Sequence, residues 1–312
     1  MPLAVGAGLA PPGPVVVQPG ADVGRARATW HAPDGGVWPL DVPDLGWLTP
    51  DEVSGLGAAP VTLVTDPHPR GGARVRHIQP QPRTITWPLV VQGRTHGEFL
   101  TRWRSLASAF TQTRRLGAGR LRIARPDGTG REILAHYEAG FDGEPGAGHT
   151  WDAAVLSLWC EDPYWLADPI TDFRAHEAAA STFLDPFMTV SSTQVLGATT
   201  ITNPGDVESW PEWTITGPAT EVQATNHTTG ESWTLTPDFG DGDSVGGNEA
   251  VITTDPPQVR GPDCEVWTGL LNWPAAVLWG LAPGLNEVTF AVSGADVGTE
   301  IRWSYRPRYE TA

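Results

Sequence analysis

The stretch RTITWPLVVQGRTHGEFLTRWRSLASAFTQTRRLGAG, residues 83–119, places a strand pattern directly before a helix pattern. Apolar side chains occupy every second position of its first part, at Ile85, Trp87, Leu89 and Val91. This alternation predicts a strand, residues 84–91, with one buried face. A proline at position 88 favours an edge position in the sheet, because proline cannot donate a ladder hydrogen bond.

The second part of the stretch has the signals of one amphipathic helix, Thr95–Arg115. Thr95 and Glu98 match the capping box, in which both side chains satisfy amides at the start of a helix. The apolar face recurs at helical spacing and consists of Phe99, Trp103, Leu106 and Phe110. Glycines at 117 and 119 end the helix. We predict that this face packs on the sheet of the first domain.

Short strand patterns lie before and after this stretch. From about residue 166 onward, turns separate the strand patterns at short intervals and no helix pattern accompanies them. Before that point the expected strands are 37–42, 61–65, 73–78, 120–125, 131–141 and 150–160. After it they are 199–202, 213–216, 221–225, 232–236, 250–253, 287–292 and 300–305. The later part has frequent turns and no convincing helix, which predicts a β-sandwich.

Composition and charge indicate two bodies. The 312 residues suffice for two domains, and 36 Gly with 30 Pro favour many turns over long helices. The net charge is −16, but residues 1–165 hold fifteen Arg against sixteen acids, and residues 166–312 hold five against twenty. We therefore divide the chain into a Pro/Gly-rich arm (1–35), a first domain (36–165) and a second domain (166–312).

Several classes of function conflict with this composition. All twenty basic residues are Arg, which excludes mechanisms that need Lys, such as phosphate-binding loops and Schiff-base chemistry. We expect no membrane insertion, since no run of 18 apolar residues exists, and no secretory signal, since prolines interrupt an uncharged start. Cys160 and Cys264 form no disulfide framework, and we expect both to be reduced and unpaired.

Motifs for catalysis and metal binding are weak. Residues 242–246 match G-x-S-x-G around Ser244, but loop residues flank the motif where a nucleophile elbow needs a strand and a helix. The overlapping stretch from Asp241 resembles the start of a calcium loop, yet Val245 and Ile252 stand at ligand positions. The eight His are scattered. We expect no catalytic residue, no metal and no cofactor, so the protein is not expected to be an enzyme.

Two features are suited to binding, and the residues alone leave both open. Residues 70–131 hold thirteen Arg against two acids. Such a span suits an acidic protein surface or nucleic acid, although an ordinary solvated face is the simpler interpretation. The seven Trp between 210 and 303 are suited to stacking on sugars, although Trp on sandwich strands more often forms core.

The order of these elements resembles a family of tail components from long-tailed bacteriophages. Residues 83–89 followed by 99–106 resemble the strand-then-helix of that family. The strand 151–160, followed by EDPYW, is similar to the family's strand before Asp-Pro-Tyr. ITNPG (201–205) and WPEWTITG (210–217) resemble the start of its second domain, and residues 283–290 and 301–309 resemble its closing strands. The chain thus looks like a siphophage distal tail protein (Dit).

This resemblance implies a mainly β fold. The first domain would be a tail-tube-like β-barrel or sandwich with one flanking α-helix, and the second a galectin-like β-sandwich. The implied function is that of a structural virion protein. Six copies would form a hexameric distal tail ring, which surrounds the DNA exit channel and joins the tail tube to the tail tip or baseplate.

The resemblance also implies partners and a location. The partners would be the tail tube protein, the tail-associated lysin or tail hub protein, and receptor-binding proteins, while DNA passes through the channel without specific binding. The protein would lie at the phage tail tip in the virion after assembly in the bacterial host cytoplasm. In such a ring we expect most arginines of 70–131 to pair with acids on adjacent subunits or stacked tail proteins.

Two alternatives remain. A tail-tube protein would share the first domain but has no need of the second. A carbohydrate-binding receptor-binding protein of the tail tip would use the Trp-rich second domain.

Overall fold

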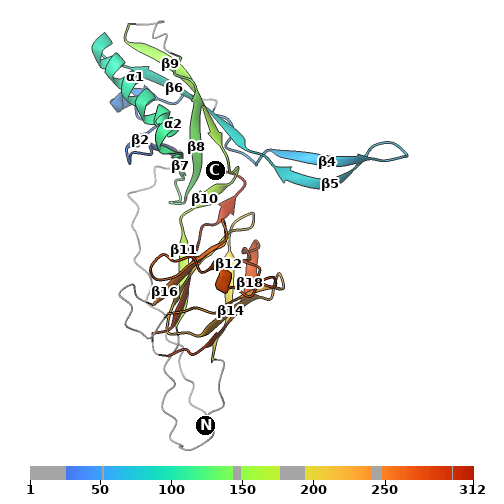
Figure 1. Ribbon diagram of the computed structural model, residues 1–312. Coiled ribbons are helices and arrows are strands. Elements are labelled where there is room, and N and C mark those ends of the chain that lie inside the picture. Colours follow the sequence, from blue (N-terminus) through green and yellow to red (C-terminus); the bar gives the residue numbers. More distant parts are fainter. Residues whose placement is uncertain (1–25, 51–52, 143–148, 176–193, 240–247, 297) are drawn as a thin grey trace, which may run out of the picture.

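The computed structural model describes residues 26–50, 53–142, 149–175, 194–239, 248–296 and 298–312. These residues are mainly β and form two bodies (Figure 1). The first body is a curled sheet with helices packed against it, and the second is a sandwich of two sheets. The expected fold class, mainly β with one long helix in the first body and a sandwich in the second, is confirmed.

Nine strands form the sheet of the first body, and their pairings are antiparallel. They are β1 (Arg27–His31), β2 (Val37–Pro39), β3 (Trp47–Leu48), β6 (Arg83–Gln92), β7 (Gly119–Ala124), β8 (Gly130–Ala139), β9 (Trp151–Cys160), β10 (Trp165–Ala167) and β20 (Arg308–Tyr309). Their main order is β2-β1-β7-β8-β9-β6-β3, with β10 paired to β8 and β20 paired to β10. A short 3₁₀ turn, η1 (Pro43–Leu45), precedes β3.

Strand β6 meets the expectation from proline 88 in part, because it is the last long strand of the sheet and only the two-residue strand β3 lies outside it. Strand β9 pairs with β6 along its whole length, whereas the described residues that pair with the other edge of β6 are those of β3 and Ser54. Pro88 lies between these two short partners, so the missing amide hydrogen removes little of the ladder.

Residues 27–31 correct the expected extent of the N-terminal arm. They form strand β1, which pairs with β7, and Trp30 is fully buried. The Trp30 ring stacks on Phe110 at 4.7 Å, and its Nε1 donates a hydrogen bond to the Ala109 carbonyl. The burial of a large aromatic side chain outweighs the Pro/Gly-rich surroundings that suggested an arm. Residues 1–25 lie outside the described part of the chain.

Helix α1 (His96–Thr111) carries the predicted apolar face into the core, where Phe99, Trp103, Leu106 and Phe110 are buried. Thr95 Oγ1 accepts from the Glu98 amide as expected, but Glu98 accepts from the amide of Arg94 instead of that of Thr95. The helix also ends at Thr111, earlier than predicted, and a separate turn α2 (Thr113–Leu116) follows. The hydroxyl of Thr113 donates to the carbonyl of Phe110, which satisfies an acceptor that a longer helix would have used.

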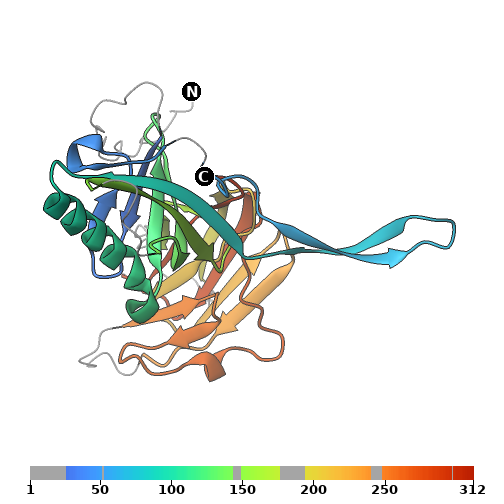
Figure 2. The same ribbon diagram turned by 90° about the horizontal axis from the view of Figure 1, so that it is seen from above.

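A long hairpin extends from the first body. Its strands β4 (Val61–Pro67) and β5 (Ala73–Pro80) pair with each other and with no other described strand. Both views show the hairpin projecting away from both bodies (Figures 1 and 2). Each of its residues is exposed.

The second body packs two antiparallel sheets face to face. One contains β11 (Ile170–Ala175), β13 (Glu212–Thr216), β16 (Glu249–Thr253), β17 (Gln258–Arg260) and β19 (Glu300–Tyr305). The other contains β12 (Gln194–Asn203), β14 (Glu221–Asn226), β15 (Glu231–Leu235) and β18 (Gly284–Ser293), and a 3₁₀ turn η2 (Thr268–Leu270) lies outside both. Trp213 lies at the centre of the core, with its ring 4.8 Å from that of Trp279.

The chain passes between the two bodies twice. After β10 it enters the second body at Ile170, and after β19 it returns, so that β20 pairs with β10. Ala312 is buried in the core of the first body. The last residues of the chain therefore pack with the first body, although they lie within the range 166–312 that the sequence assigns to the second domain.

Candidate assembly surface

Within the described residues, no group of three or more His, Cys, Asp or Glu side chains is placed to hold a metal ion. Among the same residues, no helix is long and apolar enough to cross a membrane. The loop with Asp241 and Ser244 falls in 240–247, outside the described residues.

The two cysteines lie in different bodies, and neither forms a disulfide. Cys160 on β9 is buried, and this burial raises the pKa of its thiol to about 12. Cys264 is exposed in the turn after β17. The prediction of two unpaired thiols is confirmed, but only one of them is accessible.

Most of the Trp side chains in the second body form its core. Trp213, Trp233, Trp267, Trp279 and Trp303 are buried, whereas Trp210 and Trp273 are exposed. The core interpretation is therefore confirmed for five of the seven. Buried rings present no face on which a sugar could stack.

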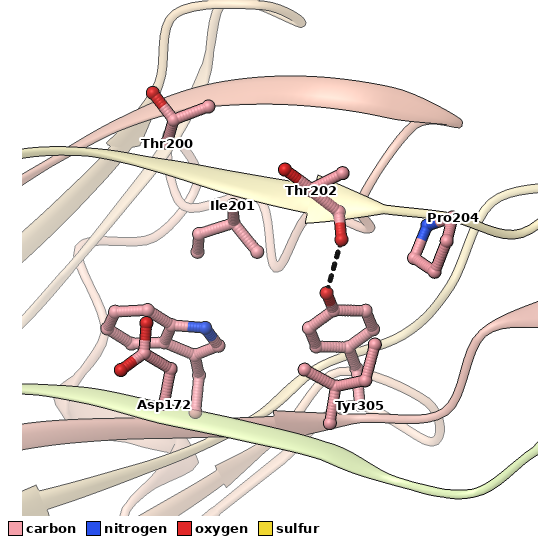
Figure 3. Close-up of a pocket in the computed structure, with 8 residues that line it drawn as sticks. Asp172, Thr200, Ile201, Thr202, Pro204 and Tyr305 are labelled. Carbon is pink, nitrogen blue, oxygen red and sulfur yellow. Dashed lines mark hydrogen bonds between the residues drawn. The ribbon is translucent and has the colours of Figure 1, made fainter. Parts of the chain in front are cut away.

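A hollow of about 400 Å³ opens between β11, β12 and β19 (Figure 3). The Tyr305 hydroxyl donates to the Thr202 carbonyl at 2.5 Å across it, and burial raises the pKa of Tyr305. Asp172 is the charged residue of its lining. Trp303 also lines the hollow, but only 2% of this residue is exposed. The hollow is thus the open edge of the sandwich and offers no stacking platform.

The arginines of residues 70–131 are mostly engaged within the chain. Four belong to ion pairs with acids in the same body: Arg76 with Asp66, Arg94 and Arg102 with Glu98, and Arg120 with Glu132. Arg122 contacts both Glu132 and Asp168. Three further arginines donate hydrogen bonds to backbone carbonyls: Arg83, Arg125 and Arg131. The guanidinium of Arg114 lies over the ring of Tyr137. Among the described residues, Arg70, Arg74, Arg104 and Arg115 take part in no ion pair. The expectation that most of these arginines pair with neighbouring subunits is therefore too broad.

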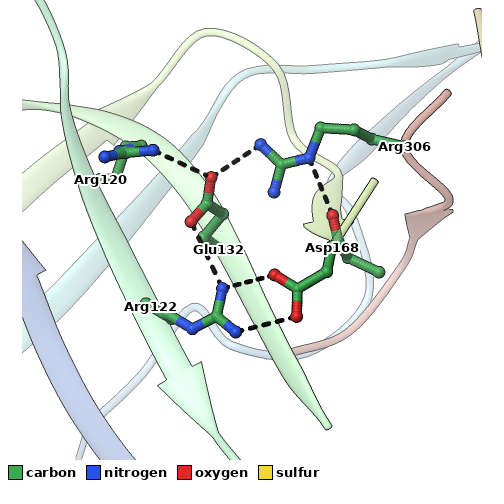
Figure 4. Close-up of polar contacts among 6 residues, drawn as sticks. Arg120, Arg122, Glu132, Asp168 and Arg306 are labelled. Carbon is green, nitrogen blue, oxygen red and sulfur yellow. Dashed lines mark hydrogen bonds and ion pairs between the residues drawn. The ribbon is translucent and has the colours of Figure 1, made fainter. Parts of the chain in front are cut away.

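One of these ion-pair networks joins the two bodies (Figure 4). Glu132 on β8 is nearly buried and accepts from Arg306, which belongs to the returning segment, at 2.7 Å. Arg122 reaches Glu132 at 3.7 Å and forms a two-bond pair with Asp168, at 2.8 and 3.0 Å. Arg306 also donates to the Ala167 carbonyl. The network fixes both chain crossings against the sheet of the first body.

The outer face of the sheet carries an apolar stripe on the side away from α1. We define the outer stripe as Leu134 on β8 with Trp151, Val155 and Trp159 on β9, all exposed. The inward residues of β9, Ala154, Leu156, Leu158 and Cys160, are buried as well. A strand that is apolar on both faces is typical of a sheet covered on both sides. The sequence of β9 contains this signal, but its pattern alone predicts a strand and does not identify what covers the second face.

The hairpin β4–β5 is also amphipathic across its two faces. Directly paired residues share a face, and the pairs on one face are Val61 with Pro80, Leu63 with Ile78 and Thr65 with Val75. About half of Leu63 and Ile78 is exposed, 52% and 54%. The expected strands 61–65 and 73–78 are confirmed, but their separation from every sheet was not predicted.

Comparison with known proteins finds similar structures but no similar sequence. No family model matches this sequence. No curated protein matches it either. Among solved structures, the chain is similar to SPP1 Dit (gp 19.1), described as a paradigm of the hub adsorption apparatus in phages that infect Gram-positive bacteria. The TM-score is 0.61 at 14% identity, over 91% of this chain and 99% of that chain.

Two structures of the phage p2 baseplate in its activated conformation, one with Sr and one with Ca, are similar too. Each has a TM-score of 0.54 at 9% identity, over 93% and 92% of this chain respectively and 100% of the baseplate chain. The likeness covers both bodies, since it spans nearly all of this chain and of each of the three structures. This chain therefore has a fold similar to that of SPP1 Dit and of the phage p2 baseplate chains.

Proposed function

We propose that this protein is a structural component of a phage tail tip, in which six copies of the first body close a ring around the DNA exit channel. The observation that carries the proposal is a Dit-type fold with two apolar surfaces, on the hairpin and on the outer sheet face, that the described residues leave exposed. Contiguous exposed apolar surface on a stable fold is typical of an interface.

The second body would face outward and hold further tail proteins. In this proposal the ring joins the tail tube to the baseplate, with the tail tube protein on one side and the tail hub or receptor-binding proteins on the other. The protein would have no enzymatic activity and would lie in the virion after assembly in the host cytoplasm. Nine of the thirteen arginines in 70–131 have partners within the chain, which supports a channel that does not grip DNA.

Mass photometry of the purified full chain tests this proposal. A ring of six would give a single main species at six times the chain mass of 33.4 kDa. A monomer at every concentration up to the micromolar range would contradict the proposal. A larger species of three or more copies but not six would reject the hexamer and leave the ring for imaging to test, whereas a dimer would contradict the ring.

A further inference from the structure

We propose that the hollow between β11, β12 and β19 binds an arginine side chain of a partner protein, and that Asp172 is the acid with which this arginine pairs. The inference rests on the proposed function and deepens it, because it names a place on the second body that holds another tail protein and the chemistry of the segment held there. The occupant is an extended segment of that protein, which runs along the free edge of β12.

The hollow has the size and the walls of a site for one long side chain. Its volume is about 400 Å³, within the range of about 300–1,000 Å³ that is usual for ligand pockets. Its apolar walls include Ile201, Trp303 and Tyr305, all of which are buried. Figure 3 shows Asp172 and Tyr305 on one side of the opening and Thr202 on the other. An arginine side chain fits such walls, since its methylene stem packs on apolar surface while its guanidinium pairs with an acid.

Asp172 brings a negative charge to the hollow that the described residues leave without a paired cation. The residue is exposed, and its carboxylate accepts from the amide of Phe173 at 2.9 Å. Among the described residues, Asp172 takes part in no ion pair. Its charge also acts on the wall of the hollow, because burial raises the pKa of Tyr305 and Asp172 adds to that shift. A cation that enters the hollow would therefore find an acid close by.

Arg174 shows that a guanidinium fits between the two strands at this edge. It lies two residues after Asp172 on β11, so the two side chains share a face of the strand. Its guanidinium lies 5.9 Å from the centre of the Trp303 ring and donates to the Thr199 hydroxyl of β12 at 2.6 Å. The chain's own arginine thus bridges β11 and β12 at one position. At the next position of the same face, the edge is hollow and carries an acid, and the partner's arginine would take the equivalent place there.

The charge of the second body favours a cationic partner. Residues 166–312 hold five Arg against twenty acids, and such a field attracts cations and repels acidic surfaces. Arginine suits the hollow better than lysine, because its planar guanidinium pairs with both oxygens of a carboxylate and stacks on aromatic rings. The chain has one such group of its own: Arg308 donates to both oxygens of Asp162, at 3.0 and 2.9 Å, and lies 4.6 Å from the centre of the Tyr164 ring.

The edge of β12 offers backbone partners to an extended segment. Strand β12 pairs with β18 and with no other described strand, so its other flank is a sheet edge. Backbone amides and carbonyls on such an edge can receive a further strand. The Thr202 carbonyl, to which the Tyr305 hydroxyl donates, points from this edge into the hollow (Figure 3). A segment that pairs with β12 would therefore pass over the hollow, and one of its side chains would enter it.

Disulfide capture of short peptides tests the proposal in the full chain. Thr200 lines the hollow, and Thr200→Cys in a Cys264→Ser background places one accessible thiol there. The protein is equilibrated in a thiol buffer with acetyl-Cys-Gly-Arg-amide or with the same peptide carrying citrulline, the neutral isostere of arginine. Intact-mass measurement gives the fraction of chains that carry each peptide. We expect the arginine peptide to be captured about fivefold more strongly, the upper range for an exposed ion pair.

Three variants show whether this preference belongs to the hollow. Asp172→Asn should abolish it, whereas Glu212→Gln, at an exposed acid of β13 in the same sheet, should leave it unchanged. A thiol at the exposed turn residue Thr229 instead of Thr200 should prefer arginine by less than about twofold. Equal capture of both peptides at Thr200→Cys, or a preference that survives Asp172→Asn, would overturn the proposal.

The capture experiment and the test of the ring fail separately, because peptide capture does not require assembly. Six-fold rings without a preference for arginine would overturn the site in the hollow and leave the proposed function standing. A preference that depends on Asp172 in a chain that stays monomeric would support the site and reject the ring. The absence of both would overturn both.

Discussion

At the scale of single residues, Glu132 is the acid on which the connection between the two bodies depends. Only 8% of its side chain is exposed, and Arg120, Arg122 and Arg306 surround it. Removing one partner of a buried pair leaves the other charges without compensation. We expect Glu132→Ala to lower the free energy of unfolding by about 3–5 kcal/mol in urea denaturation. The matched change Asp168→Asn, at a side chain that is 63% exposed, should cost less than about 1 kcal/mol. Equal losses would contradict this account of the network.

The pH dependence of stability tests the contribution of the Asp168 charge. The hydrogen bonds from Arg122 lower the pKa of Asp168 below its ordinary value of 3.8. A lowered carboxyl pKa contributes stability that is complete well above the unfolded-state value and is lost as pH falls through the folded-state pKa. We therefore expect the small difference between wild type and Asp168→Asn at pH 7 to vanish by about pH 2. A difference that persists at that pH would assign the effect of the variant to packing instead of charge.

The two thiols differ in reactivity because of burial. Cys160 is buried with a pKa raised to about 12, whereas Cys264 is exposed. Since the thiolate is the reactive form, alkylation of the native protein without reductant should add one group, on Cys264. In denaturant it should add two. Intact-mass measurement checks both numbers, and two groups on the native protein would contradict the burial of Cys160.

Sequence patterns at this scale identified side chains with local partners and missed those with distant ones. The cap at Thr95 and the proline at 88 follow from a few neighbouring residues, and both were predicted. The roles of Arg83 and Glu132 were not predicted, since Arg83 donates to the carbonyl of Glu310, 227 residues away, and Glu132 accepts from Arg306, 174 residues away. No local pattern contains such contacts.

At the scale of elements, helix α1 holds the first body together through one aromatic face. The ring of Trp103 lies 5.9 Å from that of Phe99 and 5.1 Å from that of Phe141. Trp103→Ala should therefore lower the free energy of unfolding by about 3–5 kcal/mol, the usual cost of removing a large buried aromatic side chain. The neighbouring exposed Arg104 supplies the control, and Arg104→Ala should change stability by less than about 0.5 kcal/mol. A loss below about 1 kcal/mol in Trp103→Ala would place this side chain outside the core.

Most elements could be predicted from their periodicity, but the pairing of β4 with β5 apart from the sheets could not. Alternation in residues 61–65 and 73–78 predicts strands, and it does not say which sheet they join. The same limit applies to the outer stripe, because alternation identifies the buried face of β9 but not the partner of its other face. Both parts of the candidate interface depend on what lies outside the chain.

At the scale of the whole molecule, the two bodies are joined by two crossings and one charge network. Strand β20 pairs with β10, and Ala312 enters the first core. The second body is therefore inserted in the first, and a ring built from first bodies would carry every second body in one fixed orientation. The order of the motifs predicted the Dit-type fold, whereas the return of residues 306–312 to the first body was not predicted.

Negative-stain electron microscopy of the purified full chain tests the central claim most directly. The account predicts class averages of a closed ring with a central channel, six-fold symmetry and the second bodies arranged around the first. Single two-lobed particles at all concentrations, or averages of two copies without a channel, would contradict it.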